Sequence, residues 1–176
     1  QNWFGFASAS LISCFIGISL WLTNRSKQEL NLGLKEAFLL TNFAWVLSGI
    51  FGALPFVFSD LGLSFTDAIF ESISGITTTG STILINIELA SPGIILWRAL
   101  LQWLGGIGII VMALAILPTL SVGGMQLFKT ETYEASDNAI PRARQLAGGI
   151  FAVYATLTFI WSCMLWIAGM TSFDAL

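Results

Sequence analysis

The sequence predicts an all-helical integral membrane protein, on the evidence of its composition, its apolar segments and the placement of its charges. Of the 176 residues, 56% are hydrophobic and 10% are charged, whereas about 25% of the residues in a soluble domain are usually charged. Mean hydropathy is +0.83. Four segments approach or exceed the roughly 20 apolar residues that a helix needs to cross a bilayer. They cover residues 4–22, 37–58, 93–118 and 148–170.

The charges divide the connecting segments into two kinds. Six of the seven basic residues lie between the first and second spans or between the third and fourth: Arg25, Lys27, Lys35, Lys129, Arg142 and Arg144. All the charged side chains in residues 59–92 are acidic. Because cytoplasmic loops are enriched in Lys and Arg, we expect both basic loops in the cytoplasm and residues 59–92 to start and end outside. The chain is therefore predicted to cross the plasma membrane several times.

Residues 64–75, SFTDAIFESISG, predict a helix too short to span. Ser64 and Asp67 have the spacing of a capping-box start, and Gly75 predicts the stop. About eleven helical residues reach only about 16 Å, roughly half of the hydrocarbon core. We therefore expect a re-entrant half-helix that enters the membrane from outside, after which the chain returns to the same side.

The returning segment, ITTTGSTI at residues 76–83, is rich in Thr, Ser and Gly. Non-helical backbone at membrane depth is tolerated only where protein buries it or water lines it. Carbonyl oxygens of such a loop can replace the hydration shell of a monovalent cation, and the C-terminal dipole of the half-helix favours a cation there. The pattern indicates a selectivity filter, and the alternative is an external loop of small polar residues.

An internal repeat and a glycine cluster favour the filter. GLSFTDAI (62–69) and GMTSFDAL (169–176) each follow a span at an offset of 107 residues, as expected for a pore built from repeated units. In the third span, Gly105, Gly106 and Gly108 allow close approach by a neighbouring helix. We expect them to pack against the pore helix, although ordinary small-residue packing between membrane helices predicts the same glycines.

Three stretches carry a family resemblance: FESISGITTTGST, WRALLQWLGGIGIIVMALAILP and GGMQLFKTETYEAS. They resemble the Trk/Ktr/HKT superfamily of potassium transporters, in particular its bacterial TrkH-type uptake subunits. The resemblance implies four helix–pore loop–helix units around one pore. This sequence would then hold an extra span with its cytoplasmic loop (1–30), one complete unit (31–120), a cytoplasmic linker (121–147), and the first helix and start of the pore helix of the next unit (148–176).

The resemblance also implies potassium translocation, with the ion as substrate, no bound cofactor, and a filter held mainly by backbone carbonyls. The implied filter residues are Thr78, Thr79, Gly80, Ser81 and Thr82, with potassium at the first three of these. It further implies a cytoplasmic nucleotide-binding regulatory ring as partner, which residues 129–144 could contact if they are not a solvated linker. We also expect membrane lipid around the protein, a homodimer of the full-length protein, and no nucleic acid.

Three charged residues need separate interpretation. A carboxylate at half-membrane depth is costly unless it is paired or wetted, so we interpret Glu71 as filter support bonded to loop amides or a neighbouring unit. The alternative is a carboxylate turned to an aqueous vestibule. Asp67 is interpreted first as a helix cap and then as filter support. Arg98 is interpreted as a snorkelling anchor beside Trp97, in preference to a partner for an outer carboxylate.

Enzymatic activity is not expected. The chain has no histidine, the commonest general base and metal ligand, and contains no GxSxG, HExxH or Walker motif. Two alternatives to the potassium-uptake subunit stay open: a small channel completed by homotetramerisation, and a structural membrane subunit that transports nothing. An intramembrane protease is disfavoured because no acidic or basic side chain can be placed at mid-depth in the spans.

Overall fold

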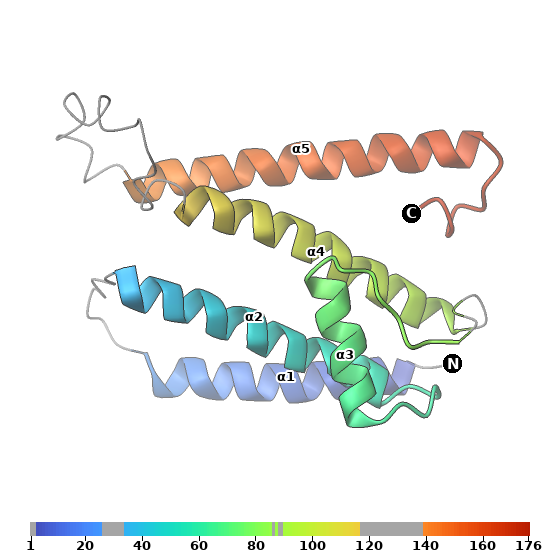
Figure 1. Cartoon of the computed structure of the whole chain (residues 1–176), viewed down its shortest axis with the longest axis horizontal. Helices are drawn as coiled ribbons and strands as arrows, with labels where there is room; N and C mark the ends of the chain where they lie inside the picture. The colour runs from blue at the N-terminus through green and yellow to red at the C-terminus, as the bar shows by residue number, and fades with distance from the viewer. Residues whose placement is uncertain (1–2, 26–33, 86, 88–89, 117–138) are drawn as a thin grey trace. The chain divides into compact units, whose positions relative to one another are not determined.

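The computed structural model describes residues 3–25, 34–85, 87, 90–116 and 139–176. Over these ranges it contains five helices and no strand: α1 (Trp3–Thr23), α2 (Leu34–Val57), α3 (Phe65–Ile76), α4 (Pro92–Ile116) and α5 (Ala139–Ile167) (Figure 1). The chain divides into two compact units, Gln1–Gly106 and Ile107–Leu176.

Four described helices are long and apolar enough to cross a membrane: Trp3–Thr23, Phe38–Val57, Pro92–Ile110 and Ala147–Ile167. They match the four predicted spans, so the prediction of an all-helical, multi-pass membrane protein is confirmed. Their outer faces carry large exposed apolar side chains, such as Leu11 at 72% and Phe15 at 73%. Soluble monomers rarely expose contiguous apolar patches of this kind.

Helix α5 begins at Ala139, eight residues before the part of it that could span a membrane, which begins at Ala147. The predicted linker (121–147) would therefore include the first turns of α5, and its bounds stay a prediction. Pro141 lies in the first turn of the helix, where a missing backbone N–H breaks no intrahelical bond. The Arg-Ala-Arg-Gln run that follows contains strong helix formers. The proposed docking segment, residues 129–144, lies mainly outside the described residues.

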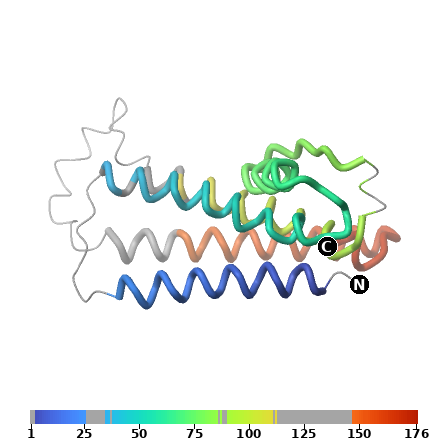
Figure 2. The backbone as a smooth tube through the Cα atoms, turned by 90° about the horizontal axis from the view of Figure 1, so that it is seen from below, coloured from blue at the N-terminus to red at the C-terminus, as the bar shows by residue number. Residues whose placement is uncertain are grey.

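In the first unit, α1 and α2 run lengthwise while α3 lies across them (Figures 1 and 2). The buried core joins α2, α3 and the first half of α4. Trp97 of α4 donates its indole N–H to the carbonyl of Gly52 in α2, at 2.9 Å. The core therefore fixes α3 against two span-length helices. Its fully buried apolar members are Ala53, Phe56, Ala68, Ile94 and Leu101.

In the second unit, the segment after α5 repeats the hydrogen bonds that start α3. Ser64 donates its hydroxyl to Asp67 at 2.7 Å and accepts the Asp67 amide at 3.2 Å. Thr171 does the same with Asp174, at 2.6 and 3.2 Å. The sequence repeat is thus also a structural repeat of the capping turn. Left-handed backbone recurs at the same offset, at Gly62 (φ 64°) and Gly169 (φ 105°).

Candidate functional site

Helix α3 begins as predicted and ends one residue later than predicted. Ser64 is the N-cap and accepts the Asp67 amide, which confirms the capping start. The predicted stop at Gly75 is wrong, because Gly75 is helical and packs against α4. A Cβ on Gly75 would lie 3.2 Å from the Cβ of Leu101. The chain turns instead at Thr78, whose φ is 57°.

The segment that follows α3, residues 77–83, is called the threonine loop here. Its backbone folds back onto the last turns of α3 and is held there by Ser74. The Ser74 carbonyl accepts the amides of Thr79 at 3.0 Å and Gly80 at 3.3 Å, and the Ser74 hydroxyl donates to the Ser81 carbonyl at 2.6 Å. Gly80 has φ 78°, a conformation that costs little only for glycine. The loop is therefore a defined non-helical structure.

Glu71 is fully buried, at 0% exposure, and supports the far end of the loop. One carboxylate oxygen accepts the Thr82 hydroxyl and the Ile83 amide, both at 2.6 Å. The other accepts Nε of Arg98 at 3.1 Å. The expected bond between Glu71 and a loop amide is present, whereas a carboxylate facing an open vestibule is not what the structure contains.

Arg98 corrects the sequence interpretation. It is not a snorkelling anchor, because its side chain is only 14% exposed and forms an ion pair with Glu71. Its Nη2 also donates to the carbonyls of Gly80 at 3.1 Å and Ser81 at 3.4 Å. A buried carboxylate in an apolar setting requires a cationic partner. That requirement is the signal that could have identified Arg98, which lies 27 residues away from Glu71.

The predicted ion-binding carbonyls fall into two groups. Those of Gly80 and Ser81 accept protein donors, so an ion at Gly80 would share its oxygen with Arg98. For the carbonyls of Thr78, Thr79 and Thr82, no donor is present among the residues the structure describes. A carbonyl oxygen has two lone pairs, so the bond from Arg98 does not prevent the Gly80 carbonyl from binding an ion as well. Binding of potassium at Thr78, Thr79 and Gly80 stays a prediction.

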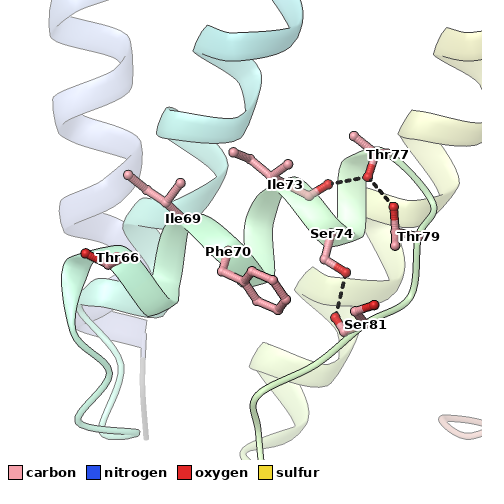
Figure 3. A pocket seen from close by; sticks show the side chains of 8 residues that line it. All are labelled: Thr66, Ile69, Phe70, Ile73, Ser74, Thr77, Thr79 and Ser81. Atoms are coloured by element: carbon pink, nitrogen blue, oxygen red, sulfur yellow. Dashed lines mark hydrogen bonds between the residues drawn. The ribbon is translucent and has the colours of Figure 1, made fainter.

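The threonine loop also lines a hollow of about 360 Å³. Figure 3 shows that one face of α3 lines it, with Thr77, Thr79 and Ser81 contributed by the loop. The Thr77 hydroxyl bonds the Ile73 carbonyl and the Thr79 hydroxyl, both at 2.8 Å, at the edge of this hollow. The full lining is Thr66, Ile69, Phe70, Ile73, Ser74, Thr77, Thr79 and Ser81.

The remaining predicted site residues lie in α4 or at the start of α3, and none of them lines the hollow. Gly105 of α4 lies directly against the backbone of Ile76, where a Cβ would overlap the Ile76 carbonyl. Gly106 and Gly108 are partly buried in the same helix, and their packing against the pore helix stays a prediction. Asp67 bonds Ser64 at the start of α3, about 13 Å along the helix from its end. Its contacts support the helix start and do not reach the loop.

Fold and site together define a class: a multi-pass helical membrane protein with a polar backbone loop held beside a span. The family model described as "TrkH: Cation transport protein" matches residues 4–175. The chain therefore belongs to the TrkH cation transport family.

Named relatives agree with this assignment. The chain is 44% identical to the "Trk system potassium uptake protein TrkH" of Escherichia coli K12 over 174 residues, which is 97% of the chain and 36% of that protein. It is 49% identical to TrkI of Halomonas elongata over 140 residues, or 80% of the chain and 28% of that protein. Identity to TrkG of E. coli K12 is 32%, over 100% of the chain and 37% of the relative. The chain thus spans about a third of the length of the curated relatives it matches.

Proposed function

We propose that this chain forms part of a potassium-uptake protein of the inner membrane, with residues 78–82 as one wall of its selectivity filter. The proposal is supported by relatives that are named as potassium uptake proteins. The observation that carries it is the threonine loop itself. Its supporting contacts come from Ser74, Glu71 and Arg98, while its Thr79 and Ser81 side chains line an open hollow.

The physical role of the loop follows from its position. The twelve residues of α3 reach about 18 Å, too short to cross a hydrocarbon core of about 30 Å. As a re-entrant half-helix, α3 would deliver its C-terminal dipole and the loop carbonyls to mid-membrane depth, where both favour a cation. Glu71 and Arg98 compensate each other's charge, so the buried carboxylate does not act as an ion trap.

One such loop cannot surround an ion, so the complete pore requires further units of the full-length protein. The repeated capping turn at Thr171 and Asp174 is consistent with the start of the next unit. The cytoplasmic nucleotide-binding ring and the homodimer are partners that we propose for the full-length protein. The parts of the chain that we expect to face such a ring, including most of residues 129–144, lie outside the described residues.

A glycine substitution in the full-length protein tests the filter. Gly80→Ser adds a side chain where φ is 78° and nothing lies within 4 Å of the new Cβ, so its effect comes from backbone strain of about 1–2 kcal/mol and not from a clash. We expect discrimination of potassium against sodium to fall more than protein abundance does. The measurement is potassium uptake with and without competing sodium, normalised to the protein in the membrane.

Gly62→Ser is the matched control. Gly62 also has positive φ, 64°, with nothing within 4 Å of an added Cβ, but it precedes α3 and lies outside the loop. This variant is expected to share the backbone strain and to keep normal ion discrimination. Equal discrimination in the two variants would show that residues 78–82 are not the filter.

A further inference from the structure

Ser74 makes more contacts with the threonine loop than its place in the last turns of α3 suggests. Its carbonyl accepts the amides of Thr79 and Gly80, at 3.0 and 3.3 Å. Its hydroxyl donates to the Ser81 carbonyl at 2.6 Å (Figure 3). Helical serines often turn the hydroxyl back to the carbonyl four residues earlier. Here the hydroxyl leaves its own helix and bonds a residue seven positions ahead.

The Ser81 carbonyl is therefore held from two sides. Ser74 donates at 2.6 Å and Arg98 at 3.4 Å, and the shorter bond comes from a residue that is only 5% exposed. In the next residue, Thr82 is fixed separately through its hydroxyl bond to Glu71. The Ser74 hydroxyl thus makes the shorter of the two bonds that set the direction of the peptide group between Ser81 and Thr82, and without it the Ser81 carbonyl keeps only the 3.4 Å bond from Arg98.

We propose that Ser74 is a positioning residue of the ion pathway, whose hydroxyl keeps the Ser81 carbonyl turned toward α3 and thereby sets ion discrimination at the neighbouring filter carbonyls. The inference rests on the proposed function of the loop. Without the bond, the Ser81 carbonyl can rotate toward the ion, which changes the number of oxygens that replace its hydration shell. Selectivity then changes while the helix and its packing are retained.

The chain contains a matched control two residues away. Ser72 lies in the same helix at 0% exposure, and its hydroxyl has no hydrogen-bond partner within the described part of the chain. It packs against α2, where a Cβ on Gly52 would lie 2.5 Å from the Ser72 hydroxyl oxygen. Ser72→Ala and Ser74→Ala remove the same atom from similarly buried positions, but only the second removes a bond to the loop.

The experiment uses the full-length protein in two measurements. Amide hydrogen exchange over residues 78–83 reports loop order without reference to transport, and we expect it to be about five-fold faster in Ser74→Ala, the factor that corresponds to one neutral hydrogen bond. Potassium uptake with competing sodium, normalised to protein amount, is expected to show a similar loss of discrimination. Ser74→Thr keeps the hydroxyl and can place its methyl group in the hollow, so it should restore both, while Ser72→Ala should alter neither.

The possible results distinguish a failure of the positioning role of Ser74 from a failure of the proposed function of the loop. Equal exchange in Ser74→Ala and Ser72→Ala overturns the positioning role. Faster exchange in Ser74→Ala with unchanged discrimination overturns the link between the hydroxyl and selectivity. A wild-type protein with no potassium-selective uptake refutes the proposed function instead, and the exchange measurement still decides whether Ser74 orders the loop.

Discussion

Adding one methyl group at Gly105 tests whether the end of α3 is held by backbone contact with α4. In Gly105→Ala the new Cβ would overlap the carbonyl oxygen of Ile76 and lie 2.6 Å from its carbonyl carbon and 3.0 Å from its Cα. All three are backbone atoms, so no side-chain rotation can relieve the overlap. Helix α4 must move away from the residue that precedes the threonine loop.

The expected magnitude follows from two opposing effects. Inserting a carbon into a well-packed site costs typically about 1–3 kcal/mol, and the better helix propensity of alanine returns up to about 1 kcal/mol. The control variants share the propensity gain, so Gly105→Ala is expected to be about 1–3 kcal/mol less stable than they are. Gly17→Ala and Gly149→Ala are the controls, because nothing lies within 4 Å of a Cβ at either position. Both should be neutral or slightly stabilising.

The assay is thermal unfolding of the purified full-length protein in one detergent, with potassium uptake measured on the same variants. Gly105→Ala should unfold at a lower temperature than either control and should also lose uptake, because the displaced backbone continues directly into the loop. If Gly105→Ala is as stable as Gly17→Ala, the contact between α4 and Ile76 does not exist in the folded protein and the reasoning fails.

Two further predictions concern the buried ion pair and the orientation of the chain. Glu71→Gln keeps an oxygen for the Ile83 amide but turns an amide donor toward Arg98. Breaking a buried ion pair in this way is expected to cost about 3–5 kcal/mol of stability. Adding Arg98→Met to this variant should recover part of that loss in the same unfolding assay. In a background without the two native cysteines, a cysteine at Ile85, which is 90% exposed, should react with an impermeant reagent from outside, and one at Asn24 only from the cytoplasm.

Each of these has a distinct contrary result. A double variant that loses as much stability as the sum of the two single variants would show that Glu71 and Arg98 are not energetically coupled. Labelling at Ile85 from the cytoplasmic side of intact membranes would contradict the re-entrant path, because residues 77–85 would then have crossed the bilayer.

Features that depend on composition or on neighbours along the chain could be predicted from the sequence. Four spans follow from apolar segments that match the hydrocarbon thickness, and the structure contains four helices at those places. The start of α3 follows from a hydroxyl and a carboxylate three residues apart, a contact made within a single turn. The repeat of GLSFTDAI in GMTSFDAL was visible in the sequence, and the structure adds that Thr171 and Asp174 form the same turn.

The attachment of the loop to α4 depends on contacts that form only when α3 and α4 pack together. Arg98 has no local feature that distinguishes a snorkelling side chain from a buried partner, and its role appears only when α4 is placed beside α3. The end of α3 was misjudged for a related reason: Gly75 is used for close packing on Leu101 and not for a turn. The directions of the Gly80 and Ser81 carbonyls depend on donors from Ser74 and Arg98. The Arg98 contacts arise from the packing of α4 against α3, and the Ser74 contact depends on how the loop folds back onto α3, so neither follows from residue spacing alone.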